Sequence, residues 1–446
     1  MKKTAPALLI SLLLAGPLRA ASPGTLFQTR TLPNGLTVVV QEDRSIPVAA
    51  VNVWYNVGSK DEKKGKTGFA HLFEHYMFEG SEHAPGGQYF SRIFGMGGIT
   101  NANTTSDRTD YYAVVPSEGV EEVLRLESDR MGWLRGAMNQ GSLDKQRGIV
   151  KNEKRLREGQ PYGGAWEALG ETVWPKDHPY RWPVIGSMAD LDGASLDDVK
   201  AFHAEYYAPN NAVLTVAGDV SAAEVFAQAE KWFGAIPAGK APSRNNIPAV
   251  TAPAQASRTV VDDKARLPLL FVAYPIPGKG QPGWAEMAVV ASVLGGGRTS
   301  RLVQALQYDR NLVLSVDASV TGMHENDLFI VSAMPAPGVK ADVVRAAIDA
   351  ELAKVVRDGV TPRELGRVRA GLKTARLDAL QEAEGVAASL AEGQGRFGDP
   401  GFNETVDARV QAMDPEAARA AAAKYLRPGN AAGVSVVPAP RPGGPR

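Results

Sequence analysis

The sequence predicts an α+β protein built from two related halves. Helical patterns such as 119–133 follow strand patterns such as 110–115 without strict strand–helix alternation. A stretch rich in Pro and Ala, residues 238–256, lacks a sustained period of 2 or 3.6 and is predicted to be a linker. The halves on either side of it each open with two strand patterns, a turn and a helical pattern. This similarity suggests a distant internal duplication.

The N-terminus has the pattern of a bacterial signal peptide, predicted to span residues 1–21. Met1 to Thr4 is cationic, Ala5 to Ala15 is apolar, and small residues follow at positions 20 and 21. The apolar run is too short to span a bilayer, which takes about 20 residues. No later segment reaches that length without charges. We therefore expect a periplasmic protein whose mature chain has no membrane span; an uncleaved membrane anchor is the alternative.

The first half, residues 26–237, carries strand patterns rich in β-branched and apolar residues and helical patterns with an apolar face. The strands are expected at 36–40, 48–55, 110–115 and 212–217. The helices are expected at 119–133, 143–158, 197–207 and 221–233.

The second half, residues 257–435, repeats this arrangement. Its strands are expected at 258–261, 269–274 and 328–333. Its helices are expected at 284–294, 340–356, 362–393 and 415–425. The remaining segment, residues 436–446, contains four Pro and two Gly and is predicted to be a disordered tail.

Composition limits the chemistry that the chain can perform. Its 446 residues include 49 basic and 49 acidic side chains, so no long-range field attracts nucleic acid. The absence of Cys excludes disulfides, thiolate zinc sites, iron–sulfur clusters and a Cys nucleophile. Any metal site must therefore use His and carboxylates.

One segment, His71-Leu72-Phe73-Glu74-His75, concentrates the candidate chemistry. Helix positions four apart differ by about 40°, so His71 and His75 can hold one ion from the same helix face. Glu74 can reach a metal-bound water without being a ligand. This order of residues is the inverted zincin signature. The alternative is two solvated His on a surface helix, but the apolar neighbours favour a buried helix, in which paired imidazoles without a ligand would be costly.

The motif and its surroundings resemble the pitrilysin/insulinase family of zinc metallopeptidases, in its half-length bacterial secreted type. Gly58 and Gly68 precede the motif as in that family. Further matching segments are Gly97-Gly98 with Asn101 to Thr105, Tyr206 to Ala212 with Gly218-Asp219, and Leu294 to Arg298 with Ser300-Arg301-Leu302. The resemblance implies two related domains, each an antiparallel-rich sheet with helices packed on one face, that form half of a clamshell. Only the first domain would bind metal.

A catalytic zinc takes three protein ligands and leaves one position open. The family supplies its third ligand as a Glu from a downstream helix, and the resemblance places Glu153 there. Glu158 should face away, since it lies about 140° further round the helix. Gln146 stands where the family usually has a Glu that supports a ligand; Gln can donate a hydrogen bond but brings no charge. We expect one Zn²⁺ per chain.

These residues predict zinc-assisted hydrolysis, and the resemblance implies a metalloendopeptidase that hydrolyses short or unfolded peptides in a closed chamber. Zinc would lower the pKa of its bound water to about 7, and Glu74 would take the proton as the water attacks the scissile carbonyl. The resemblance implies that substrate lies extended along Asn101, Ala102, Asn103 and Thr104 and adds a strand to the sheet. For Asn101 and Asn103, ordinary turn chemistry is the alternative.

The second half departs from the family. Active members carry an Arg and, seven residues later, a Tyr that bind the substrate carbonyl; counting from Ser300 places Gln307 and Leu314 at these positions. Tyr308 and Arg310 are near but have the wrong order and spacing. Since losing one oxyanion donor costs about 100-fold to 1000-fold in rate, we expect a heterodimer. The partner would be a homologous subunit without the zinc motif that supplies Arg and Tyr.

Two alternatives to this heterodimer stay open. One is a homodimer of the present chain. The other is a non-catalytic scaffold or assembly subunit of the same family. The remaining histidines, namely His83, His178, His203 and His324, are interpreted as surface or packing residues.

Overall fold

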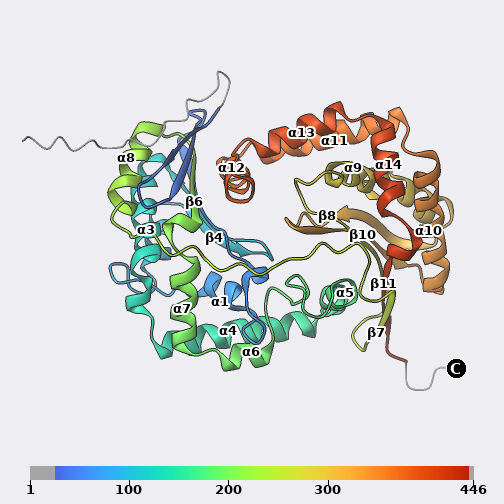
Figure 1. The fold of residues 1–446 in the computed structure, drawn as a ribbon, viewed down its shortest axis with the longest axis horizontal. Coiled ribbons are helices and arrows are strands. Elements are labelled where there is room, and N and C mark those ends of the chain that lie inside the picture. The colour runs from blue at the N-terminus through green and yellow to red at the C-terminus, as the bar shows by residue number, and fades with distance from the viewer. Residues whose placement is uncertain (1–25, 441–446) are drawn as a thin grey trace, which may run out of the picture.

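The computed structural model describes residues 26–440, so the predicted signal peptide lies outside it. The chain forms two sheets with helices around them, one sheet in each half (Figure 1). The predicted α+β class with two related domains is therefore confirmed. Among the described residues, no helix combines the length and apolar character needed to cross a membrane.

The first half contains fourteen named elements in chain order. They are β1 (Gln28–Thr31), β2 (Thr37–Glu42), β3 (Val48–Tyr55), α1 (Phe69–Tyr76), α2 (Gln88–Gly95), β4 (Ile99–Thr104), β5 (Thr109–Pro116), α3 (Val120–Ala137), α4 (Gln140–Gly159), α5 (Ala165–Val173), α6 (Met188–Gly193), α7 (Leu196–Tyr206), β6 (Ala212–Gly218) and α8 (Ala222–Phe233).

The second half follows the linker and has a similar order of elements. They are β7 (Ser257–Asp262), β8 (Leu269–Pro277), α9 (Trp284–Gly295), the π-helix η4 (Val303–Asp309), β9 (Val313–Val320), β10 (Asn326–Pro335), α10 (Ala341–Asp358), α11 (Pro362–Ala379), α12 (Ala383–Phe397), α13 (Phe402–Ala412), α14 (Pro415–Tyr425) and β11 (Ala432–Pro438).

The two sheets share one topology, which supports the predicted duplication. The first has the strand order β1-β2-β6-β3-β5-β4 and the second β7-β11-β8-β10-β9. In each, one parallel pair (β2 with β6, β7 with β11) is followed by antiparallel pairs. Within residues 26–440, the second sheet lacks only a counterpart of β1. Both sheets end in an antiparallel edge strand, β4 in the first and β9 in the second.

Each half sends a helix across to the sheet of the other half. The helix α12 packs Ala387 and Leu390 against Trp54 and Val213 of the first sheet. The helix α5 packs Leu169 against the second sheet. Figure 1 shows α12 between the two sheets and α5 beside β11. The predicted helix layer on one face of each sheet is thus supplemented by a helix from the other half on the opposite face.

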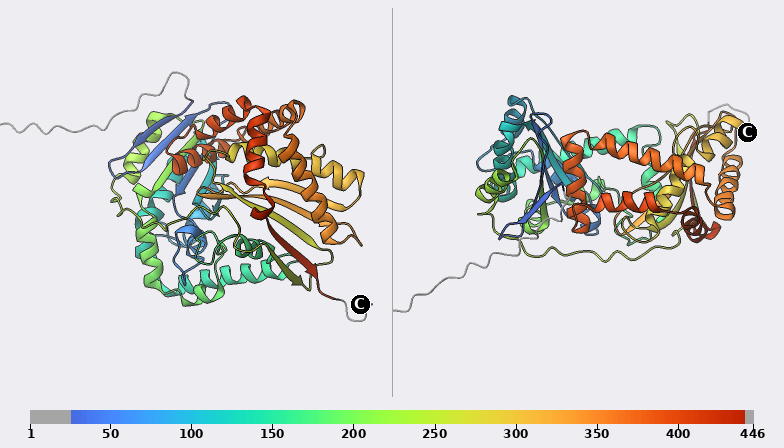
Figure 2. Two further views of the ribbon diagram at one scale, coloured as in Figure 1. Left: turned by 45° about the vertical axis from the view of Figure 1, so that its right-hand side comes forward. Right: turned by 90° about the horizontal axis from the view of Figure 1, so that it is seen from above.

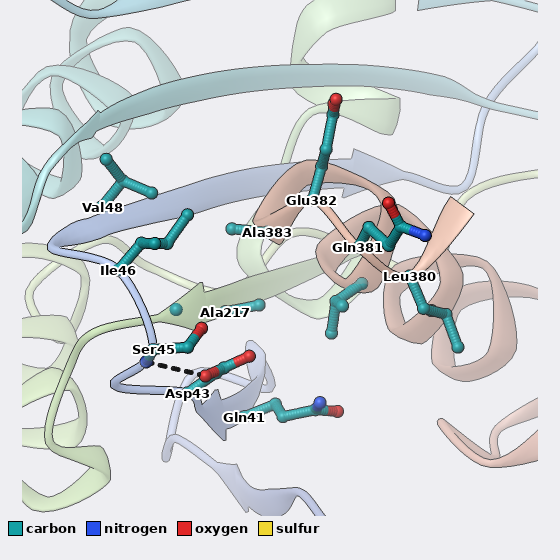
Figure 3. Close-up of a pocket in the computed structure, with 12 residues that line it drawn as sticks. Gln41, Asp43, Ser45, Ile46, Val48, Ala217, Leu380, Gln381, Glu382 and Ala383 are labelled. Carbon is teal, nitrogen blue, oxygen red and sulfur yellow. Dashed lines mark hydrogen bonds between the residues drawn. The ribbon is translucent and has the colours of Figure 1, made fainter. Parts of the chain in front are cut away.

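The prediction of one helix over 362–393 is wrong, because the chain breaks at Leu380–Glu382 into α11 and α12. No Pro or Gly occurs among these three residues. The break lets α12 leave the second half and bury Ala387 and Leu390 on the first sheet. The connection then lies against the β2–β3 loop, where Ile46 and the hydrogen-bonded pair Asp43 and Ser45 help to line a small pocket (Figure 3).

The linker, residues 238–256, has no regular secondary structure, as predicted. It runs along one side of the molecule from one half to the other (Figure 2). Its side chains are nevertheless anchored: Arg244 contacts Asp61 at 2.9 Å, and the side-chain amide of Asn245 donates to the carbonyls of Lys60 and Glu62, at 2.7 Å each.

The predicted disordered tail begins too early. Strand β11 continues to Pro438, with Val436 and Val437 paired to Val260 and Val261 of β7. The valines favour the strand despite the nearby prolines, and Pro438 stands at its last position, where a missing N–H is tolerated. The last residues of the predicted tail, 441–446, lie outside the described residues.

Candidate metal centre

The helix α1 carries the predicted metal-binding motif and is held in the first domain by its apolar face. Leu72 and Phe73 are fully buried, and the Tyr111 hydroxyl donates to the Phe73 carbonyl at 3.0 Å. Gly68 precedes the helix with φ of 89°, a left-handed conformation that favours glycine. A Cβ atom there would also meet the Ile185 carbonyl oxygen at 2.8 Å. Glycine is therefore needed just before this helix, where the backbone of Gly68 lies close to that of Ile185.

The helix α4 supplies the third candidate ligand. It begins at Gln140, three residues before the predicted start at 143. The helix starts there because the Asn139 side chain accepts a hydrogen bond from the Ser142 N–H. Glu153 lies on the side of α4 that faces α1. One of its oxygens, Oε2, is 3.6 Å from His71 Nε2 and 3.5 Å from His75 Nε2. Glu158 instead pairs with Lys154 at 2.9 Å.

These three side chains fit a zinc ion. Ligand atoms about 2.0–2.1 Å from a tetrahedral ion are separated by roughly 3.4 Å, close to the spacings of Glu153 Oε2 from the two imidazoles. Within residues 26–440, His71, His75 and Glu153 are the only group of three or more His or acidic side chains arranged to share an ion. The pattern of one carboxylate and two imidazoles is a common catalytic zinc ligand set.

Burial favours the neutral form of the His71 imidazole, which is the form that binds a metal. It lowers the pKa of His71 to about 3, and repulsion from His75 and from the Arg157 guanidinium acts in the same direction. His71 is therefore neutral at physiological pH, as a ligand must be. Its Nδ1 atom is buried and has no hydrogen-bond partner among the described residues. Only Nε2 is directed at the Glu153 carboxylate.

Glu74 lies beside the ligands and next to β4. Burial raises the pKa of its carboxyl above the ordinary value, whereas the Thr104 hydroxyl and His75 act against this shift. The Thr104 hydroxyl lies near this carboxylate without completing a hydrogen bond to it. A carboxylate with a raised pKa beside a candidate metal site can accept a proton from water and release it again.

The four predicted substrate-binding residues lie on β4, whose outer edge has no partner strand among the described residues. Asn101 and Asn103 are exposed, while Ala102 is buried. They belong to a strand paired with β5, so the turn interpretation does not hold for them. No sequence pattern indicated that Arg108 donates to both the carbonyl and the side-chain oxygen of Asn103, at 2.8 and 2.7 Å.

Gln146 is buried beside the site, but its amide donates to Glu79. Glu79 also receives a hydrogen bond from Lys145 at 2.7 Å. The described contacts of Gln146 thus reach a carboxylate that follows α1, and none of them reaches His71, His75 or Glu153. Helical spacing does not indicate this partner, because Glu79 lies outside both helices, after the end of α1.

The two departures in the second half lie next to each other. Gln307, in η4, donates its side-chain amide to the Leu314 carbonyl of β9 at 2.9 Å. Leu314 is exposed, and Gln307 is half-buried. Tyr308 accepts a hydrogen bond from Arg298 Nε at 3.2 Å instead of pairing with Arg310. The positions of the missing Arg and Tyr are therefore adjacent, the first partly accessible and the second exposed.

Comparison with known proteins places this site in a family. The model described as Insulinase (Peptidase family M16) matches residues 37–166, and that described as Peptidase M16 inactive domain matches residues 193–372. The zinc protease PqqE of Helicobacter pylori is 30% identical over 369 residues, which cover 81% of this chain and 82% of that protein. The chain belongs to the M16, or insulinase, family of peptidases. All the candidate zinc ligands lie within the first M16 match.

Solved structures agree with membership of the M16 family. A protease from Helicobacter pylori superimposes with a TM-score of 0.86 at 26% identity, covering 92% of this chain and 99% of that one. The periplasmic protease PqqL of Escherichia coli has a TM-score of 0.75 at 20% identity. The match covers 92% of this chain but 47% of PqqL. The expected half-clamshell fold is thus confirmed, and one M16 chain of this length corresponds to about half of the longer protein.

Proposed function

We propose that this chain is a zinc metalloendopeptidase that hydrolyses short or unfolded peptides. The observation that carries the proposal is the approach of His71 Nε2 and His75 Nε2 to one oxygen of Glu153, at 3.6 and 3.5 Å. Zinc, when held by these three residues, would act as a Lewis acid and lower the pKa of a bound water to about 7. The zinc proteases among its relatives support this choice of metal.

Glu74 is the proposed general base. Its carboxyl has a raised pKa and lies beside the ligand set, so it can take the proton of the attacking water and pass it to the leaving amine. The free edge of β4 then orients the peptide, because an extended chain can add to the sheet through main-chain hydrogen bonds. Such binding uses few side-chain contacts and gives loose sequence specificity.

A homologous partner subunit is part of the proposal. The neighbouring residues Gln307, half-buried, and Leu314, exposed, offer neither the cation nor the phenol expected of an active chain. A partner of the same fold, without the zinc motif but with Arg and Tyr, would close the clamshell into a chamber; a homodimer is the fallback. The length of PqqL, about twice that of this chain, supports two halves as the working unit. The periplasmic location of PqqL and the predicted signal peptide support secretion to the periplasm.

The first test measures metal content and cleavage together. Purified protein should bind one zinc ion and, with its partner, cleave a quenched peptide in a chelator-sensitive way. Glu74→Gln should keep the zinc and lower the rate by about 100-fold to 10,000-fold, because it removes only the general base. Loss of zinc in Glu74→Gln, or unchanged cleavage, would contradict the assigned role.

The second test separates the enzyme from a scaffold subunit. Cleavage is compared for the chain alone, for the chain with the product of a neighbouring reading frame, and for Gln307→Arg combined with Leu314→Tyr. The partner, or the double substitution, should increase the rate. Full activity of the unmodified chain alone refutes the need for a partner. Zinc binding without cleavage in any of these mixtures favours the scaffold function.

A further inference from the structure

The metal helix α1 has only eight residues, and its first ligand is in the first turn. The initial N–H groups of a helix have no partner within it, so a short helix depends on an external acceptor at this end. Gly68 precedes α1 and has no side chain that could accept these hydrogen bonds. If the first turn frayed, His71, its third residue, would lose its position before His75.

Glu62 supplies the acceptor. This residue is 1% exposed, and its two carboxylate oxygens accept hydrogen bonds from the N–H groups of Gly68, at 2.9 Å, and Ala70, at 2.8 Å. The carboxylate also lies at the N-terminus, where the helix dipole favours a negative charge. The two oxygens thus accept hydrogen bonds from the residues on either side of Phe69, the first residue of the helix.

Glu62 is itself held by the linker between the two halves. Asn245 donates to the carbonyls of Lys60 and Glu62, both at 2.7 Å, and Arg244 contacts the neighbouring Asp61 at 2.9 Å. These contacts fix the backbone from which the Glu62 side chain extends. A continuous series of hydrogen bonds therefore connects Asn245 through Glu62 to the first turn of α1.

We propose that Glu62 is a positioning residue for the metal centre and that Asn245 of the linker holds it in place. The inference rests on the proposed zinc site. Because the hydrogen bonds fix where α1 starts, they also fix the distance of the His71 imidazole from Glu153 on α4. The linker then does more than join the halves, since its path helps to set the geometry of the ligands.

The test compares three variants of the full chain. Glu62→Gln keeps the size of the side chain but replaces one acceptor by a donor. Asn245→Ala removes both contacts to the 60–62 segment. Asn210→Ala is the matched control, because Asn210 makes two hydrogen bonds to Gly239 near the linker's start, at 3.0 and 2.8 Å, without any contact to Glu62.

Zinc affinity is measured by competition with a chelator, and ligand geometry by the absorption spectrum of Co²⁺ bound in place of zinc. Glu62→Gln should weaken zinc about tenfold or more and change the Co²⁺ spectrum. Asn245→Ala should weaken it about 2-fold to 10-fold. Asn210→Ala should match the wild type. A purely structural cap would lower the melting temperature without altering either metal measurement well below that temperature.

Wild-type zinc affinity and Co²⁺ spectrum in folded Glu62→Gln would overturn the inference. If Glu62→Gln does not fold, Asn245→Ala decides, and metal binding equal to that of Asn210→Ala overturns it. Failure of the wild-type protein to bind zinc would instead refute the proposed metal site. The two failures are therefore distinguishable.

Discussion

His203 should make the protein sensitive to acid, and the expected size of the effect follows from its surroundings. The side chain is 2% exposed, stacks on Tyr207 with a centroid distance of 5.5 Å, and contacts Phe73 of the metal helix. Neither ring nitrogen completes a hydrogen bond among the described residues. Burial, with a smaller contribution from Arg135, lowers the pKa of His203 to about 3, although the Arg130 main chain opposes the shift.

The sign follows from proton binding. In the unfolded chain this His has a pKa near 6.5, so below that pH the unfolded state binds a proton that the folded state excludes. Stability is therefore lost as the pH falls from about 6.5 towards 3. Because pH 5 lies about 1.5 pH units below the unfolded pKa, the free energy of unfolding is lower there by roughly 2 kcal/mol than at neutral pH.

His203→Phe should remove this sensitivity while keeping an aromatic ring against Tyr207. For a domain of this size, 2 kcal/mol corresponds to about 4–8 °C in melting temperature. In thermal unfolding, the melting temperature should fall between pH 7 and pH 5 in both proteins. We therefore expect this decrease to be about 4–8 °C smaller in the variant than in the wild type. His71 and the other histidines contribute equally to both proteins. Identical drops in wild type and variant would refute the argument that a neutral, desolvated His203 limits acid stability.

Two further predictions concern the metal and the crossing helix. Glu153→Ala should abolish stoichiometric zinc binding, whereas Glu158→Ala, on the same helix but paired with Lys154, should keep it; equal zinc contents by atomic absorption would contradict the ligand assignment. Leu390→Ala should destabilise the protein by about 3 kcal/mol in denaturant unfolding, because this 3% exposed side chain of α12 packs on the first sheet. Leu377→Ala, 55% exposed on α11, is the control and should change stability by less than about 0.5 kcal/mol; similar values for both would rule out the packing role of α12.

Local patterns predicted most individual elements well. The predicted bounds agree with the structure to within a residue or two for the helices 197–207 and 284–294 and the strands 48–55 and 212–217. Their apolar periodicity matches the faces that are buried. The helix over 362–393 failed for a different reason. Its break at 380–382 has no local signal and reflects the burial of Leu390 on a sheet more than 160 residues earlier in the chain.

The candidate site shows the same division. The spacing of His71, Glu74 and His75 follows from helix geometry and could be interpreted from the sequence alone. The contacts of Gln146 with Glu79 and of Arg108 with Asn103 could not, because they join different elements or depend on a turn conformation. The partner of Gln307 is likewise found only when η4 and β9 are brought together.

The sequence by itself determined that a metal site would use imidazoles and carboxylates. Helical spacing indicated two of the three ligands, and the family resemblance implied the third, Glu153. The sequence did so because composition and helical spacing are properties of the chain before it folds. Only the tertiary structure decided that Glu153 meets both imidazoles, that β4 pairs on one side alone with a strand of the described chain, and that the linker reaches the residue capping α1. These features arise where separate helices, strands and loops pack together, and no local pattern specifies which atoms then come into contact.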